Sequence, residues 1–299
     1  MNVISGEAAA LGTAVCWAVA YVFFTLAVRR IGARALNRLR LVIALGFLTL
    51  LHLLIYREPF PFHAELSRWA WLSLSGAVGF ALADAMLFRA LFYIGAHRTS
   101  LVMALVPVFS TLLAWGIFKE VLTIWQSIAI VMTLAGIGFV VWEPGSLRDP
   151  VVSKRILTGV VFALGAAAAQ ALRYIFSKEG MGGDFPVLST NVIQILAATV
   201  ILWTWALLRG QMRATVEGLR HPRARWATMG GAVAGPFAGV TLSLVALKFA
   251  PVGVASTLMA LPPVLLLPLS CVVFKESIRG RALIGTTLAV AGVAMLFLF

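Results

Sequence analysis

Charged residues are scarce in this chain of 299 residues, where they make up 12% of the sequence. Soluble domains usually contain about 25%. Hydrophobic residues account for 61% of the chain, and the mean hydropathy is +0.98. A chain with so little charge cannot cover a water-facing surface. The composition therefore excludes a soluble globular protein and indicates an integral membrane protein.

The sequence also lacks the motifs of several active-site classes. No Gly-x-x-x-x-Gly-Lys-Ser/Thr sequence occurs, which argues against an ATP-driven pump. Cys16 and Cys271 both fall inside apolar runs, where a small apolar side chain is their ordinary role. The four histidines are scattered and form no metal or catalytic cluster: His52, His63, His97 and His221. We therefore expect no catalytic residues, no metal, no cofactor and no enzymatic activity.

Long apolar runs recur along the whole chain. A helix needs about 20 apolar residues to cross a hydrocarbon core roughly 30 Å thick. The alternating segments of about 10 residues that are typical of a β-barrel are not seen. The first run is too long for a signal-peptide core, so we interpret it as a retained span. The sequence predicts an all-α membrane protein with ten transmembrane helices, at residues 6–28, 36–56, 69–94, 99–117, 123–142, 156–177, 187–208, 226–247, 252–273 and 280–298.

The net charge of +13 is distributed unevenly along the chain. Seventeen Lys and Arg residues, Arg38 and Arg40 among them, fall in connections after odd-numbered spans, against five after even-numbered spans. Short loops rich in Lys and Arg mark the cytoplasmic side of a membrane. The charge is therefore a topology signal, and we expect no nucleic-acid partner. We expect a bacterial inner-membrane protein, and the charge distribution predicts that both of its termini lie in the periplasm.

The two halves of the chain repeat one another. A shift of 156 residues places Phe118-Lys119-Glu120 on Phe274-Lys275-Glu276, and 13 of the 44 positions in 98–141 are then identical without a gap. We expect each Lys-Glu pair to lie at the turn between the last two helices of its half, where Glu is favourable at a helix N-terminus. Two copies of five spans must point in opposite directions across the membrane. The sequence thus predicts two inverted five-helix repeats, 1–147 and 148–299, a pattern of many secondary transporters.

Several motifs resemble a known family. The run from Arg89 to Val141, repeated from Val245 to Phe299, is similar to the EamA-type repeat of the drug/metabolite transporter superfamily. The resemblance rests on Ala-Leu at 90–91 and 246–247, on a Pro in the following span, on Glu at the turn and on a Gly-containing last helix. The segment Asn37-Arg38-Leu39-Arg40-Leu41 also resembles the family's entry to its second helix. The resemblance covers essentially the whole chain. It implies transport of amino acids, drugs or other metabolites, and commonly implies cytoplasmic termini, against the charge distribution.

Asp84, Arg89 and Arg173 fall inside predicted spans and away from the counted loop charges, where an unpaired charge costs at least about 2.5–3.5 kcal/mol. Asp84 and Arg89 lie five residues apart on one helix, about 140° apart around its axis, so they do not pair easily. We expect Asp84 to face Arg173, where the two either contact a zwitterionic substrate or form a structural ion pair between the halves. Arg89 lies nearer the end of its span, and snorkelling to the interface is the alternative role there.

Further polar and aromatic residues are candidates for a cavity lining. Shifts of 153 and 154 residues match Trp17 and Tyr21 to Gln170 and Tyr174, and match Asn37 and Arg40 to Asn191 and Gln194. In the family that this chain resembles, the first and sixth spans line the central cavity. Packing and hydrogen bonds between helices are the structural alternatives. The expected cavity lining is Trp17, Tyr21, Asp84, Met103, Gln170, Arg173, Tyr174, Asn191, Gln194 and Met259, and the matched Pro107 and Pro263 are candidate gates or static kinks.

The functional hypothesis is a secondary transporter that moves a small polar or amphipathic metabolite by alternating access, with amino acids the best guess. The resemblance favours export over import. The alternative is a multidrug exporter of lipophilic cations, and a membrane scaffold or enzyme is more remote. Glu7 stands at the start of its span, so Asp84 either binds the coupling proton or the protein exchanges substrates without one. The expected partners are the substrate, protons and the lipid bilayer. Spans 5 and 10 are the least polar and could meet lipid or a second subunit in a homodimer.

Overall fold

The computed structural model describes residues 3–118, 123–141, 150–250, 255, 258–274 and 280–298. Within that part of the chain every regular element is a helix. The α-helices are α1 (Val3–Tyr56), α2 (Leu66–Gly76), α3 (Asp84–Met103), α4 (Val106–Phe118), α5 (Ile124–Val141), α6 (Pro150–Met181), α7 (Val187–Leu208), α8 (Met212–Glu217), α9 (Pro222–Ala232), α10 (Val240–Phe249), α12 (Pro262–Phe274) and α13 (Gly280–Leu298). Two π-helices, η1 (Ala77–Ala83) and η3 (Val233–Gly239), and a 3₁₀ turn, η2 (Gly218–Arg220), complete the elements.

Two glycines divide long apolar stretches into pairs of spans. The stretch Gly6–Tyr56 has 51 residues, which as one helix would be about 77 Å long, far more than a membrane is thick. It bends at Gly32, where φ is 75°, and Leu66–Met103 bends in the same way at Gly95, where φ is 76°. Positive φ angles are readily adopted only by glycine. Each bend therefore separates one membrane crossing from the next.

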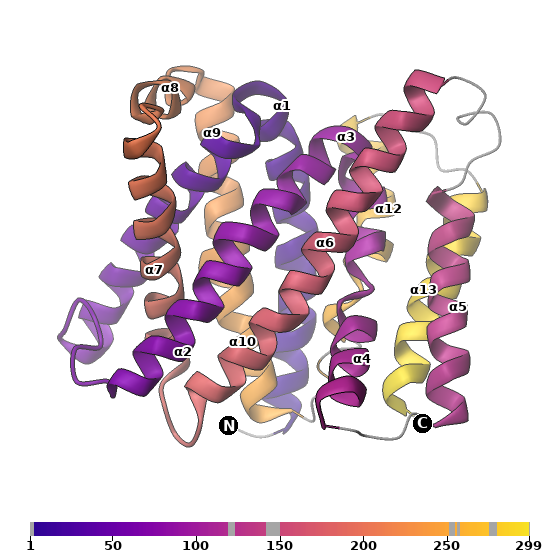
Figure 1. The fold of residues 1–299 in the computed structure, drawn as a ribbon, viewed down its shortest axis with the longest axis horizontal. Coiled ribbons are helices and arrows are strands. Elements are labelled where there is room, and N and C mark those ends of the chain that lie inside the picture. The colour runs from indigo at the N-terminus through magenta and orange to yellow at the C-terminus, as the bar shows by residue number, and fades with distance from the viewer. Residues whose placement is uncertain are drawn as a thin grey trace.

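Six described stretches are long and apolar enough to cross a membrane: Gly6–Tyr56, Leu66–Met103, Ile124–Val141, Pro150–Met181, Val187–Leu208 and Pro222–Phe249. The bends at Gly32 and Gly95 divide the first two stretches, and the segment after Gly95 forms the fourth span together with α4. With α12 and α13 as the ninth and tenth, the described helices account for the ten predicted spans. The prediction of an all-α membrane protein with ten transmembrane helices in two five-helix repeats is confirmed. In Figure 1 the successive spans run alternately up and down the molecule.

The repeats agree in fine detail along the third and eighth spans. In each, an α-helix of 11 residues is followed by a π-helix of 7 residues, α2 and η1 in the first repeat and α9 and η3 in the second. The shift between these elements is 156 residues. A π-helical turn is rare and is often found at a functional site. Because the π-helix occurs at matched positions in both halves, we infer that it is a feature of the repeated five-helix unit.

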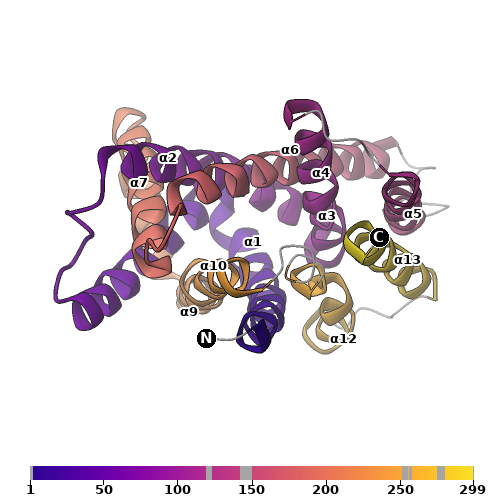
Figure 2. The same ribbon diagram turned by 90° about the horizontal axis from the view of Figure 1, so that it is seen from below.

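Glycine contacts show that the repeats pack against each other with two-fold symmetry. A methyl group added to Gly6 would lie 2.7 Å from the backbone nitrogen of Ala250, and one added to Gly159 would lie 2.5 Å from the side chain of Ile94. Shifts of 153 and 156 residues relate these two contacts. The first half of α1 thus packs on α9 and α10 as α6 packs on α2 and α3, which Figure 2 shows from below.

The last helices of the two repeats, α5 and α13, lie side by side at one end of the molecule (Figures 1 and 2). Gly136 faces the backbone of Gly285 and Ala289, and Gly292 faces that of Ala129 and Thr133. Small residues at these positions let the helix backbones approach closely. A shift of 156 residues exchanges the two contacts, so the pair is antiparallel and symmetric.

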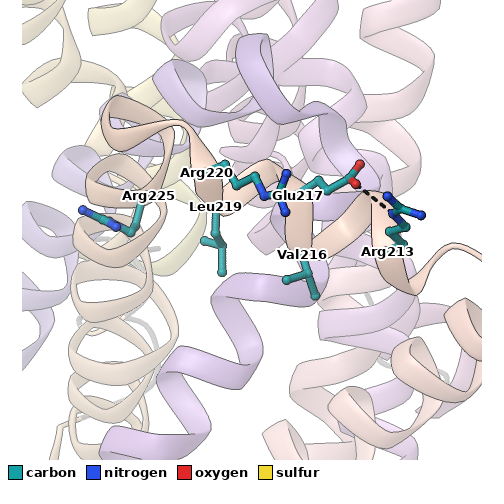
Figure 3. Close-up of a pocket in the computed structure, with 6 residues that line it drawn as sticks. All are labelled: Arg213, Val216, Glu217, Leu219, Arg220 and Arg225. Atoms are coloured by element: carbon teal, nitrogen blue, oxygen red, sulfur yellow. Dashed lines mark hydrogen bonds and ion pairs between the residues drawn. The ribbon is translucent and has the colours of Figure 1, made fainter.

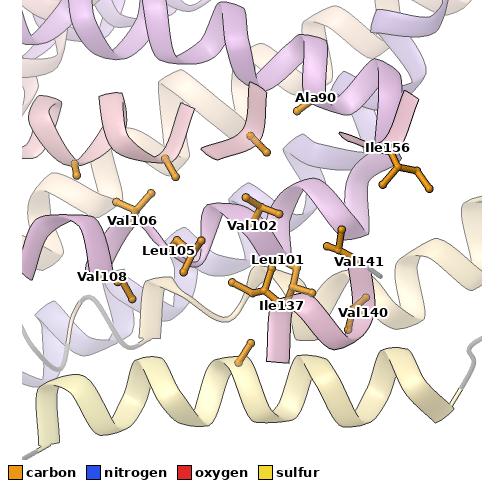
Figure 4. Packing of buried hydrophobic residues seen from close by; sticks show 14 of the residues in the cluster. Ala90, Leu101, Val102, Leu105, Val106, Val108, Ile137, Val140, Val141 and Ile156 are labelled. Atoms are coloured by element: carbon orange, nitrogen blue, oxygen red, sulfur yellow. The ribbon is translucent and has the colours of Figure 1, made fainter. Parts of the chain in front are cut away.

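A cluster of buried apolar side chains joins α3, α4, α5, α6 and α13 (Figure 4). It includes Leu101, Val102 and Leu105 from the first part of the fourth span, and Ile137 and Val140 from α5. On the outer faces of α5 and α7, by contrast, large apolar side chains such as Val131, Val200 and Leu208 are exposed. Apolar side chains on an outer surface are typical of helices that face lipid.

The start of α1 and the end of α13 lie at the same edge of the molecule in Figure 1. The bend of α1, α8 and the start of α6 lie at the opposite edge. These three segments carry basic residues that the sequence analysis placed on the cytoplasmic side: Arg29, Arg30, Arg34, Lys154, Arg155 and Arg213. One edge of the molecule is therefore rich in positive charge, and the termini lie at the other.

Two arginines had been assigned to the wrong environment. Arg38 and Arg40 were counted among the loop cations, but both are buried inside α1. Without these two residues, the connections after odd-numbered spans still hold fifteen Lys and Arg residues, against five in the connections after even-numbered spans. The predicted turns Lys119-Glu120 and Lys275-Glu276, and the predicted repeat boundary between residues 147 and 148, lie outside the described residues.

We predict that Gly136→Ala lowers the melting temperature of the purified protein in detergent by several degrees, an effect of about 1–3 kcal/mol. The added methyl group would lie 2.5 Å from the backbone nitrogen of Ala289, so α5 and α13 must move apart. Gly138→Ala is the matched control, because nothing lies within 4 Å of a methyl group there. Equal melting temperatures for the two variants would contradict the close packing of α5 on α13.

Candidate functional site

Three charged side chains are buried where the two repeats meet. They are Arg40 on the second half of α1, Asp84 at the start of α3 and Arg173 on α6. The side chains of Arg40 and Asp84 are 3% and 14% exposed, and Arg173 is 2% exposed as a residue. Charges inside a membrane are costly and mark functional sites by default. We therefore take these three residues as the centre of the candidate site.

Arg40 and Asp84 form an ion pair. Arg40 also donates two hydrogen bonds to Oδ1 of Asn37, one helical turn earlier, at 3.2 Å from Nε and 2.9 Å from a terminal nitrogen. Its guanidinium carbon lies 4.7 Å from the ring centroid of Phe88 and 5.5 Å from that of Phe24. A guanidinium group within about 6 Å of an aromatic ring gains cation–π stabilisation. The charge of Arg40 is thus compensated on several sides.

Arg173 is held mainly by neutral groups. It donates a hydrogen bond of 3.1 Å to Oε1 of Gln194 on α7, and its guanidinium carbon lies 4.3 Å from the centroid of the Phe80 ring. Its side chain also lies against Gly79, where an added methyl group would be 2.0 Å from its Cδ. The buried Nε of Arg173 has no hydrogen-bond acceptor among the described residues. Arg173 therefore retains capacity to bind an anionic group.

A chain of hydrogen bonds ties Arg173 to both repeats. Gln194 donates to the hydroxyl of Ser177 at 2.9 Å, and the hydroxyls of Ser177 and Ser75 lie 2.8 Å apart. Ser75, on α2 of the first repeat, also donates to the backbone carbonyl of Arg173 at 3.0 Å. These bonds cross from α6 and α7 to α2. A movement of one repeat against the other would therefore change the surroundings of Arg173.

The charges of this cluster do not balance. Two guanidinium groups share the single carboxylate of Asp84, which interacts electrostatically with Arg173 as well as with Arg40. Of the other ten acidic residues of the chain, nine lie in or beside the predicted connections, and Glu7 stands at the start of the first span. The cluster thus carries an excess positive charge that an anionic group of a ligand would offset.

The π-helices position this cluster. Asp84 follows directly on η1, and Phe80, which stacks on Arg173, lies within η1. The amide of Asn37 donates a hydrogen bond of 3.0 Å to the backbone carbonyl of Phe80. In the second repeat, Asn191 donates a bond of the same length to the carbonyl of Pro236 in η3. The same asparagine–carbonyl bond thus fixes the π-helix in both repeats.

The three charges depart from the repeat symmetry. The position equivalent to Arg40 is Gln194, that equivalent to Asp84 is Val240, and that equivalent to Arg173 is Ala20. The helices that carry Gln194, Val240 and Ala20 adopt the same arrangement as the helices that carry Arg40, Asp84 and Arg173. Each five-helix repeat can therefore fold without these charges. A role in the fold alone does not explain why the three charged residues are present.

The remaining expected lining residues fall into two groups. Tyr21 and Tyr174 both interact electrostatically with Asp84, and Gln170 contacts Tyr174. Asn191 and Gln194 are fully buried. Gln194 accepts a hydrogen bond from Arg173, whereas Asn191 bonds to Pro236 and Thr241 and not to a residue of the charged cluster among the described hydrogen bonds. The structure does not bring the other three to the charges but packs them into apolar clusters. Trp17 and Met259 share one such cluster, and Met103 packs on the cluster of Figure 4.

The two candidate gating prolines lie at helix starts. Pro107 is in the first turn of α4 and Pro263 is in the first turn of α12, each just after a break in its span at residues 104–105 and 260–261. Proline is tolerated in the first turn because the backbone donor it lacks would have no partner there. These prolines therefore begin new helices after matched breaks and do not kink helix interiors.

Sequence reasoning missed Arg40 as a site residue and did not foresee it as the partner of Asp84. The signal was present, because Asn37 and Arg40 align with the buried pair Asn191 and Gln194. Arg89 lies apart from the cluster, with its guanidinium carbon 5.1 Å from the ring centroid of Phe162 on α6. The hydrogen-bonded Ser75 and Ser177 had no sequence signal of their own.

Comparison with known proteins identifies the family. The model of the EamA-like transporter family matches residues 4–142 and 157–298, one match in each repeat. The chain belongs to this family. An EamA-like chain is a multi-pass membrane protein of a transporter family, so the general prediction of a transporter is confirmed.

Two individual proteins resemble this EamA-like chain. A protein of Clostridium kluyveri described as an uncharacterized transporter is 23% identical over 232 residues, which cover 74% of this chain and 70% of that protein. A solved crystal structure of a protein is similar over 98% of this chain and 96% of its own, with a TM-score of 0.64 and 17% sequence identity. At that identity the likeness concerns the fold alone.

We predict that Arg40→Gln and Asp84→Val, which introduce the residues of the equivalent repeat positions, each destabilise the protein, by about 3–5 kcal/mol where a buried charge is left unpaired. The double variant should be less destabilised than the sum of the single effects, because the ion pair is then removed as a unit. Melting temperatures of the four proteins in one detergent measure this coupling. Additive effects of the two substitutions would contradict the ion pair.

Proposed function

We propose that this EamA-like chain is a secondary transporter that exports a small polar or amphipathic metabolite, of which amino acids are the best-supported class. The observation that carries the proposal is the buried cluster of Arg40, Asp84 and Arg173, which holds charges of both signs between the two repeats. A zwitterion presents one charge of each sign. Its carboxylate would bind Arg173, and its ammonium group would bind Asp84.

The hydrogen bonds of Arg173 support this assignment. The guanidinium group makes one side-chain hydrogen bond, to the neutral amide of Gln194, and its Nε has no acceptor among the described residues. A carboxylate can accept two parallel hydrogen bonds from one guanidinium group. Phe80, Tyr21 and Tyr174 supply apolar and aromatic surface around the same point. An amphipathic amino acid fits this combination better than a lipophilic cation, which Arg173 would repel.

The proposed transport cycle uses the repeat interface. Inverted repeats support alternating access when one half rocks against the other around a site near the membrane midplane. In this chain the contacts of Ser75 with Arg173 and Ser177 would break and re-form during such a movement. The π-helices η1 and η3 are the local irregularities that adjoin the site from either repeat. They are candidate points of bending, together with the breaks before Pro107 and Pro263.

Coupling to protons remains a separate part of the proposal. Asp84 is the acidic residue of the cluster and would be the proton acceptor in a proton-coupled cycle. In an uncoupled exchanger the same carboxylate would bind only the substrate ammonium group. The two versions differ in whether substrate exchange depends on pH and whether the dependence requires Asp84.

Residence in a bacterial inner membrane with both termini in the periplasm is part of the same proposal. Its support is the excess of Lys and Arg at the edge that carries the α1 bend and α8. We predict that a protease-cleavable tag fused before Met1 is cut by protease added to spheroplasts. Cleavage only after lysis would reverse the orientation and leave the site unchanged.

Counterflow in proteoliposomes tests the transport proposal. Vesicles are preloaded with one of a panel of amino acids or lipophilic cations, and uptake of the labelled compound is measured at two pH values. We predict that the wild type exchanges an amino acid and that Arg173→Gln and Asp84→Asn each reduce this exchange about tenfold or more, the loss expected for one charge-assisted hydrogen bond. Arg89→Gln is the matched control, because Arg89 is a cation on the same helix as Asp84 but lies against Phe162.

The outcomes separate the alternatives. Full exchange by Arg173→Gln and Asp84→Asn would contradict the assigned site. Exchange of lipophilic cations alone would favour multidrug export. A pH dependence that disappears in Asp84→Asn would assign proton coupling to that residue. Absence of any exchange, with stoichiometric binding of a partner protein, would favour a scaffold.

A further inference from the structure

A hollow of about 610 Å³ lies at the basic edge of the molecule, and none of the three buried charges lines it. It is formed by α8, the turn η2 and the start of α9 (Figure 3). Arg213 and Arg225 stand at its two ends, while Val216 and Leu219 point to the same side between them. Its lining is Arg213, Val216, Glu217, Leu219, Arg220 and Arg225.

The hollow is attached firmly to the rest of the protein. Arg38 is buried on α1 and donates hydrogen bonds of 3.0 Å to Oγ1 of Thr215 and 2.7 Å to Oε1 of Gln211. Gly218 packs on Ile31 at the bend of α1, where an added methyl group would be 3.1 Å from Cγ2 of Ile31. A buried cation thus holds α8 in place through the side chains of Thr215 and of its N-cap residue Gln211. The arginines of the hollow therefore project from a segment, α8, η2 and the start of α9, that is packed against α1.

The charges of the hollow are strongly positive. Its one carboxylate, Glu217, pairs with Arg213 at 3.0 Å. In the described part of the chain no carboxylate pairs with Arg220 or Arg225, and both are exposed. Arg225 also stands in the first turn of α9, where a cation opposes the helix dipole and no acidic residue is present. The hollow therefore favours an anionic ligand.

The surroundings of the hollow are those of a membrane interface. Trp226, beside Arg225, is 63% exposed, and Leu208, at the end of α7, is 76% exposed. Trp205 is exposed on the same part of α7 and lies 4.8 Å from the guanidinium carbon of Arg209. Exposed tryptophans next to arginines are typical of the level at which lipid headgroups meet acyl chains. A ligand in the hollow would have apolar protein surface within reach.

We propose that this hollow binds the phosphodiester headgroup of an anionic phospholipid through Arg220 and Arg225. The acyl chains would lie along the exposed apolar surface of Val216 and Trp226. Basic clusters next to membrane helices attract anionic lipids with about 1 kcal/mol for each Lys or Arg. Two arginines without a carboxylate partner among the described residues lie beside apolar surface, and the guanidinium carbon of Arg225 itself lies 5.9 Å from the ring centroid of Trp226. This combination favours a lipid over a free phosphate, which would gain nothing from the apolar part. The lipid site is independent of the proposed substrate.

Native mass spectrometry of the detergent-purified protein tests this site. Phosphatidylglycerol, phosphatidylcholine or inorganic phosphate is titrated into the wild type and into Arg220→Gln/Arg225→Gln. We predict that the wild type binds phosphatidylglycerol more tightly than phosphatidylcholine and that the double variant weakens this binding about 10- to 30-fold. Both arginines are exposed and without a carboxylate partner among the described residues, so the variant should keep the wild-type melting temperature without lipid.

Lys154→Gln/Arg155→Gln is the matched control, because it removes two exposed cations from the start of α6 at the same edge. This variant should bind phosphatidylglycerol like the wild type. Equal weakening by both double variants would show a general surface charge effect and overturn the site. Unchanged binding by Arg220→Gln/Arg225→Gln would overturn it as well. Binding of inorganic phosphate as tight as that of the lipid would retain an anion site but overturn the lipid assignment.

Discussion

The burial of two guanidinium groups and one carboxylate between the repeats is the constraint on which the central part of this structure depends. Inside a membrane each such charge requires compensation. Asp84 pairs with Arg40, Asn37 accepts from Arg40, and aromatic rings cover its guanidinium group. Arg173 depends instead on Gln194 and Phe80. This unequal compensation leaves Arg173 as the group best suited to bind an incoming anion.

The features that the two repeats share and the residues in which they differ have separate roles in this chain. The matched glycine contacts, the paired π-helices and the two asparagine–carbonyl bonds belong to both repeats and build the fold. The charged residues occur once, opposite Gln194, Val240 and Ala20 in the equivalent positions. A symmetric scaffold with an asymmetric centre can change between two related arrangements while it holds one ligand. The chemistry of the proposed transporter thus lies in the positions where the halves differ.

Sequence reasoning found the spans and the repeats because both depend on strong local signals. Apolar runs of membrane length and a fixed shift of 156 residues need no knowledge of which helices touch. The partner of Asp84 did depend on such knowledge, since Arg40 follows the bend at Gly32 and appears at the edge of an apolar run. The π-helices likewise have no clear sequence pattern. The first-turn position of Pro107 and Pro263 required the exact start of a helix, which composition does not give.

Exchange by the double variant Arg40→Gln/Asp84→Val tests the central claim most directly. This variant replaces the ion pair with the residues of the equivalent repeat positions, so its folding can be checked by its melting temperature before its transport is measured. Counterflow of the amino acid exchanged by the wild type is then recorded in proteoliposomes. The account predicts a folded protein that no longer exchanges the substrate. Exchange at the wild-type rate by the folded variant would show that the ion pair serves the fold alone, and would contradict the claim that the buried charges carry transport.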